Sequence, residues 1–105
     1  MYFQQGDVVM KVIKEIPEGD QVQDDLCKRR VLALGEATGH AHVLVDTEDS
    51  AKVVRVMNQL YMIISKATEL KHEEHAPIVI PPGTYQVDIV READHLAGVV
   101  RRVAD

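Results

Sequence analysis

The chain has 105 residues, of which 46% are hydrophobic and only 4% aromatic, so we expect one domain over residues 1–105 with a core of aliphatic side chains and methionine. A net charge of −5 with dispersed acidic residues argues against nucleic-acid binding, because neutralising phosphates requires a basic face. The lone Cys27 excludes an intramolecular disulfide and favours a cytoplasmic location. No signal peptide is expected, and no apolar run approaches the ~20 residues that cross a membrane.

The first half of the chain predicts β-strands separated by turns. Residues 7–13 form an apolar run that ends at a turn rich in proline and glycine. Residues 20–28 are polar and predict a loop. Residues 29–46 predict one long or bent strand, in which Gly35 and Gly39 mark breaks of the kind found at bulges and barrel corners.

The second half predicts a hairpin and a half-buried strand. Residues 52–57 and 60–66 are rich in β-branched side chains and flank an Asn-Gln turn, although their apolar positions also fit a helical stripe. Residues 84–92 follow a Pro-Pro-Gly turn and alternate between apolar and polar side chains. Residues 94–103 carry apolar side chains at helical spacing and predict a short helix or an edge segment. The expected fold is mainly β, a small antiparallel barrel or sandwich with a short C-terminal helix.

Four of the five histidines form two closely spaced pairs, His40 with His42 and His72 with His75. Side chains two apart in a strand share a face, about 6.5–7 Å apart at Cα, and side chains three apart share one side of a tight turn. If the two segments are adjacent, four imidazoles converge and predict a site for one divalent metal ion. Zinc, iron, nickel and manganese all accept imidazole ligands, and the sequence does not choose among them.

Nearby carboxylates could be further ligands of such a site or could act as a catalytic base beside it. Glu73 and Glu74 lie between the second pair of histidines and are candidates for oxygen ligands, for partners of the ligands or for a catalytic base. Asp46 follows His42 by four residues and is a further candidate ligand. With an open coordination position the metal could polarise a substrate or activate water, whereas ligation by all four histidines would make a closed, structural site.

Two other interpretations of the histidines remain open. They could be polar residues on a solvated sheet face opposite the apolar Ala41, Val43 and Val45, or they could sense pH at a subunit contact. The first functional hypothesis is therefore a cytoplasmic protein that binds one divalent metal ion, with binding or structure favoured over catalysis. The alternative is a non-enzymatic, homo-oligomeric interaction module without metal, which its small size and exposed strand edges would permit.

Three segments, TGHAH, HEEHAPIVIPPGTYQVDIVRE and RRVAD, together resemble a group of short, uncharacterised prokaryotic proteins that begin with a QGDV-type segment. The resemblance runs from Gln5 to Asp105. It implies that the two histidine pairs belong together and implies nothing about a substrate. Residues 93–100 depart from the Tyr-Asp-Pro stretch of that group, which leaves the conformation of the tail open.

A second resemblance is to the cupins, which are small metal-binding β-barrels. His40, His42 and Asp46 match the spacing of the first cupin motif, with aspartate in place of glutamate. Residues 81–83 match the Pro-x-Gly of the second motif, but Gln86 stands where that motif has a histidine. The resemblance therefore implies a metal-binding barrel in which a histidine of the second pair replaces the missing ligand.

Overall fold

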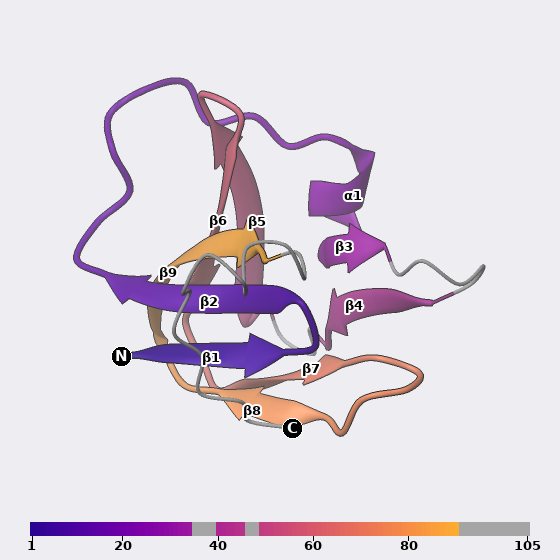
Figure 1. Cartoon of the computed structure of the whole chain (residues 1–105). Helices are drawn as coiled ribbons and strands as arrows, with labels where there is room; N and C mark the ends of the chain where they lie inside the picture. Colours follow the sequence, from indigo (N-terminus) through magenta and orange to yellow (C-terminus); the bar gives the residue numbers. More distant parts are fainter. Residues whose placement is uncertain (35–39, 46–48, 91–105) are drawn as a thin grey trace.

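The computed structural model describes residues 1–34, 40–45 and 49–90, which form two antiparallel β-sheets (Figure 1). The first sheet has five strands in the order β1 (Tyr2–Gln5), β2 (Val8–Ile13), β9 (Gly83–Ile89), β6 (Gln59–Ile64) and β5 (Ala51–Val56). The second has four strands in the order β3 (Val31–Leu34), β4 (Ala41–Leu44), β7 (Thr68–Lys71) and β8 (Ile78–Ile80). Within the described residues neither sheet closes on itself. The prediction of a mainly β fold is thus confirmed. The two sheets form a sandwich-like arrangement, and the barrel alternative is not confirmed.

The core lies between the two sheets and is built mostly from aliphatic side chains and methionine. Met10, Met62 and Tyr85 enter it from the five-stranded sheet, and each is at most 1% exposed. Leu70 and Ile80 enter it from the four-stranded sheet and are fully buried. Each sheet therefore turns one apolar face inward, as the alternation of a half-buried strand requires.

β5 and β6 form the predicted hairpin. Val56 pairs with Gln59, so Met57 and Asn58 make a two-residue turn. Both residues have positive φ, 50° and 71°, as the type I′ turn favoured in tight hairpins requires. The turn begins one residue earlier than the predicted Asn-Gln pair at residues 58–59, because Asn58 is the second residue of the turn and Gln59 already belongs to β6.

The single strand predicted over residues 29–46 is wrong as one element. β3 and β4 are separate strands that pair antiparallel, with Leu34 opposite Ala41 and Ala33 opposite His42. The chain therefore reverses direction between them. A glycine-rich interruption suits both a bent strand and a reversal, so the sequence pattern does not distinguish the two.

The predicted loop at residues 20–28 contains α1 (Asp25–Lys28), the one helix in the described part of the chain. Asp24 caps it by accepting a hydrogen bond from the Cys27 backbone N–H at 2.9 Å. The predicted C-terminal helix at residues 94–103 lies outside the described residues. No helix in the described ranges is long and apolar enough to cross a membrane.

Candidate metal centre

The pairing of β4 with β7 brings the two histidine pairs together. Val43 on β4 lies opposite Lys71, the last residue of β7. Continuing this antiparallel register by one residue sets His42 opposite His72, and their ring centroids are 4.3 Å apart. Residues thirty positions apart in the sequence are thus neighbours across two adjacent strands.

His72 contacts the other three histidines. Its ring centroid lies 5.7 Å from that of His40 and 4.8 Å from that of His75, and His42 and His75 are 5.9 Å apart. We call these four residues the histidine cluster. The cluster joins the start of β4 to the loop between β7 and β8.

Three ligand atoms at the cluster lie close enough together to suit a metal ion. His40, His72 and Glu73 each offer one such atom, and these atoms are within 4.8 Å of one another. Glu73 is exposed, whereas the two histidines are half-buried. The group found among the described residues therefore mixes imidazole with carboxylate, and differs from the predicted set of four histidines.

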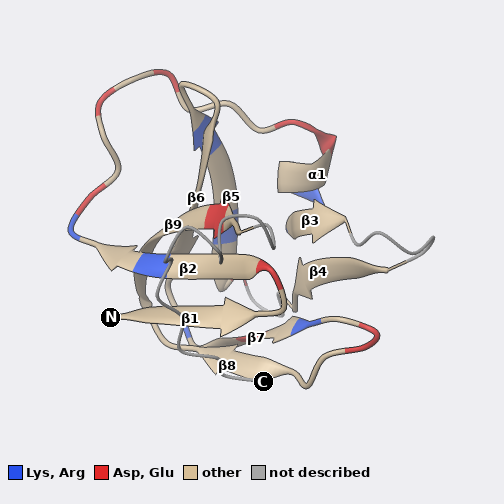
Figure 2. Cartoon of the chain, viewed as in Figure 1, with Lys and Arg blue, Asp and Glu red and all other residues tan. Residues whose placement is uncertain are grey.

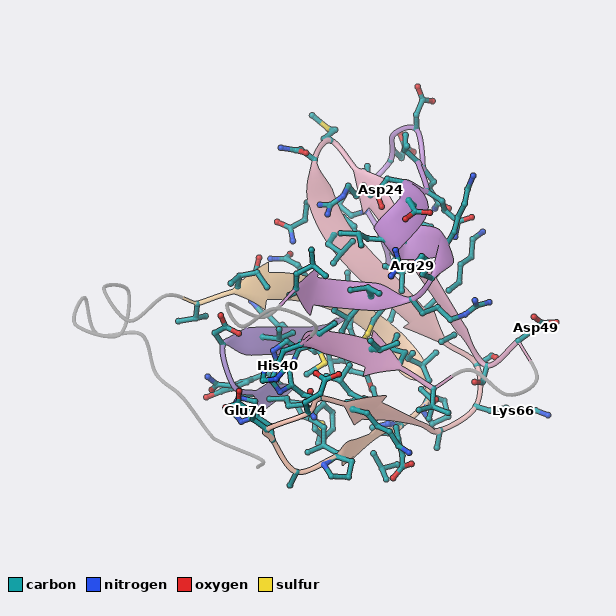
Figure 3. All side chains as sticks on the ribbon, turned by 90° about the vertical axis from the view of Figure 1, so that its right-hand side faces the viewer. Asp24, Arg29, His40, Asp49, Lys66 and Glu74 are labelled. Atoms are coloured by element: carbon teal, nitrogen blue, oxygen red, sulfur yellow. The ribbon has the colours of Figure 1, made fainter. Side chains whose placement is uncertain are left out.

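Glu74 contacts both half-buried histidines of this group. Its Oε1 lies 2.7 Å from Nδ1 of His40, and Figure 3 shows the two side chains beside one another. A carboxylate on Nδ1 holds an imidazole ring in place and directs Nε2 toward a ligand. The backbone N–H of Glu74 also donates to Nδ1 of His72 at 3.0 Å.

Glu73 reaches across to the opposite strand. Its Oε1 accepts a hydrogen bond from the backbone N–H of Ala41 at 2.9 Å. This bond is the main reason that the pKa of Glu73 lies below its usual range. A lowered pKa makes the carboxylate a weaker base, and the ionised form is also the form that binds a metal ion.

His42 is buried on the inner face of β4, with a side chain only 3% exposed. Leu44 shares this inner face, whereas Ala41 and Val43 are half-buried. The expectation that the histidines lie on a solvated face opposite an apolar one is therefore wrong for His42. Burial, followed by repulsion from His72, lowers the pKa of His42 to about 4, so this imidazole is neutral at pH 7.

A buried glutamine that the sequence did not single out holds His42. The Oε1 of Gln5 lies 2.8 Å from Nδ1 of His42, and Gln5 is fully buried. Its Nε2 donates to the carbonyls of Leu70 and Ala76 at 2.8 and 3.0 Å. The QGDV segment, in which the resemblance to other short proteins begins, was the available signal for this residue, but it indicated no role.

The turn between β1 and β2 supplies two more contacts that the sequence did not reveal. Oδ1 of Asp7 lies 3.5 Å from Nε2 of His42. Gly6 has a φ of +57°, and a Cβ atom built on it would lie 2.6 Å from Nε2 of His75. Only glycine fits this position without displacing that ring.

The other residues considered from the sequence lie apart from the cluster or outside the described residues. Asp46 and His95 lie outside the described residues. Gln86 lies on β9 of the five-stranded sheet, donates a hydrogen bond to Asp88 and is not part of the ligand group. Cys27 is 1% exposed, and burial raises the pKa of its thiol, which fits an unreactive core residue.

The chain belongs to a family defined by a domain of unknown function, DUF8820, whose family model matches residues 4–90. The match includes both histidine pairs and the β1–β2 turn. Neither the comparison with curated proteins nor the comparison with solved structures found a match. The cupin resemblance therefore gains no support.

Proposed function

We propose that this protein binds one divalent metal ion at the histidine cluster, with His40, His72 and Glu73 as ligands and with His42 and His75 beside them. The observation that carries the proposal is the approach of three ligand atoms to within 4.8 Å. Two ligand atoms about 2.0–2.1 Å from a zinc ion are about 3.3–3.4 Å apart at a tetrahedral angle. Rotation of the exposed Glu73 side chain and of the two half-buried rings can close the difference.

The charges around the cluster favour a cation. Asp7 lies beside His42, Glu74 lies beside His40, and Glu73 lies close to His40 and His72. Figure 2 shows acidic positions in both the β1–β2 turn and the β7–β8 loop. A mixture of imidazole and carboxylate suits zinc, iron(II), nickel and manganese. We therefore propose the class of ion and leave the choice within it to experiment.

Binding, with a stabilising effect, is favoured over catalysis. An ion held by His40 and His72 would tie the start of β4 to the β7–β8 loop, and a structural ion adds stability to a small domain. The two carboxylates considered as bases already have partners. Glu73 accepts a hydrogen bond from the backbone N–H of Ala41, and Glu74 contacts Nδ1 of His40. These contacts suit Glu73 to the role of a ligand and Glu74 to that of a partner of the ligand His40.

One hydrogen bond reports directly on ligation by His72. Its Nδ1 accepts from the backbone N–H of Glu74. A metal on Nδ1 would take the same lone pair, and a metal on Nε2 would require the hydrogen to move to Nδ1. Either mode breaks this bond, so the amide resonance of Glu74 should shift when the ion binds.

The test is metal content and metal titration of tag-free protein. We expect about one equivalent of zinc, iron, nickel or manganese to bind to the wild type, with a shift of the Glu74 amide resonance. His72→Ala should abolish binding. If the wild type binds none of the four ions, the proposal fails and the homo-oligomeric interaction module becomes the working hypothesis, to be tested by mass in solution.

A further inference from the structure

The turn between β1 and β2 belongs to the five-stranded sheet (Figure 1), whereas the histidine cluster that it contacts lies on the four-stranded sheet and its β7–β8 loop. Gln5 ends β1, and Gly6 and Asp7 lead into β2. Gln5 and Asp7 contact His42, and Gly6 lies against His75. Three consecutive residues thus contact the cluster, although none of them belongs to either histidine pair.

The hydrogen bonds of Gln5 fix which nitrogen of His42 carries hydrogen. The carbonyls of Leu70 and Ala76 can only accept, so the amide nitrogen of Gln5 must face them. Its oxygen then faces Nδ1 of His42 at 2.8 Å, and an amide oxygen can only accept. Nδ1 of His42 must therefore be the donor, and in the neutral ring Nε2 keeps a free lone pair.

That lone pair faces a carboxylate. Oδ1 of Asp7 lies 3.5 Å from Nε2 of His42, so when the ring is neutral with hydrogen on Nδ1, two acceptor atoms face each other. The distance exceeds the about 2.7–2.9 Å of a charge-assisted hydrogen bond between nitrogen and a carboxylate. It is close to the about 3.3–3.4 Å that separates two ligand atoms on one tetrahedral zinc ion.

We propose that Asp7 and Nε2 of His42 are two further ligands of the ion, in addition to His40, His72 and Glu73, and that Gln5 is the positioning residue that presents this nitrogen. This inference rests on the proposed metal binding and extends it to the β1–β2 turn. The ion would then link the five-stranded sheet, through Asp7, to the four-stranded sheet, through His42. Gly6 serves the same site, because its lack of a side chain lets the turn approach His75.

The first test compares zinc affinities by chelator competition for the wild type, Asp7→Asn and the matched control Asp20→Asn. The Asp7 side chain is 54% exposed, so its replacement by an amide of the same shape should leave the fold intact. We expect Asp7→Asn to weaken zinc binding at least tenfold and to change the visible absorption of the cobalt(II) form, while the exposed Asp20→Asn does neither. A change in affinity below threefold with an unaltered cobalt spectrum overturns the role of Asp7.

The second test needs no metal and examines Gln5. Long-range ¹H–¹⁵N spectra of the metal-free wild type at pH 7 should show hydrogen on Nδ1 of His42. The Gln5→Met variant should lose this preference for Nδ1, while its backbone amide spectrum should still be that of a folded protein. Hydrogen on Nε2 in the wild type would overturn the positioning role.

If the wild type binds no zinc, the proposed function fails. If it binds zinc and Asp7→Asn binds equally well, only the inference about the turn fails.

Discussion

Gly6→Ala should damage both the fold and the proposed metal site, for two separable reasons. The left-handed φ of +57° costs a residue with a Cβ atom about 1–2 kcal/mol. The new methyl group would also lie 2.6 Å from Nε2 of His75, a ring already packed against His72. We therefore expect Gly6→Ala to lower the free energy of unfolding by about 2–4 kcal/mol and to weaken zinc binding, because the ring must move.

A double-mutant cycle separates the two reasons. In the His75→Ala background the ring is absent, so Gly6→Ala should cost only the backbone contribution of about 1–2 kcal/mol. Urea unfolding of the four proteins in the presence of a chelator measures the coupling between the two positions, which we expect to be about 1 kcal/mol or more. A coupling indistinguishable from zero would refute the steric argument and leave the positive φ as the reason for glycine at this turn.

Two predictions concern regions away from the metal centre. Asp24→Ala should lower the unfolding free energy by about 1 kcal/mol at pH 7 through loss of the α1 cap. The Cys27 N–H and Arg55 lower the pKa of Asp24 to about 2 from 3.8, so the wild-type carboxylate stabilises the fold above about pH 4. The difference in urea stability should shrink as the pH falls from 4 to 2, and a constant difference would contradict this. Met57→Asn should raise the melting temperature, because Met57 is 87% exposed at a φ of 50° that asparagine tolerates better, and an unchanged or lower value would count against the turn assignment.

The fold was predictable wherever the pattern was local. Alternation identified β9, and the density of β-branched residues identified the hairpin of β5 and β6. β1 and β7 escaped prediction because they are four residues long and carry polar side chains, such as Gln4 and Gln5, that are buried in the fold. Their strand identity comes from pairing with β2 and with β4 and β8, which is information that a single short segment does not contain.

The site was predictable only in part, for a similar reason. Spacing alone indicated the two histidine pairs, and the register of β4 on β7 explains why they meet. Gln5 and Asp7 lie more than thirty residues from His42 and in the other sheet, so no motif joins them to it. Contacts between sheets depend on the whole topology, and a contribution from the β1–β2 turn became visible only with the structure.

The burial of His42 itself argues that this part of the fold serves a ligand. Position 42 shares the inner face of β4 with Leu44, which contributes to the core as an aliphatic side chain. The His42 side chain is 3% exposed and its pKa is lowered to about 4, so protonation of the ring is unfavourable in the folded protein. Its burial also contributes less hydrophobic stabilisation than burial of a leucine would. Its place also requires a second fully buried polar side chain, Gln5, to satisfy Nδ1. Two buried polar residues whose arrangement leaves one lone pair directed at the carboxylate of Asp7 are a local departure from an apolar core, and such departures are expected where a protein binds something.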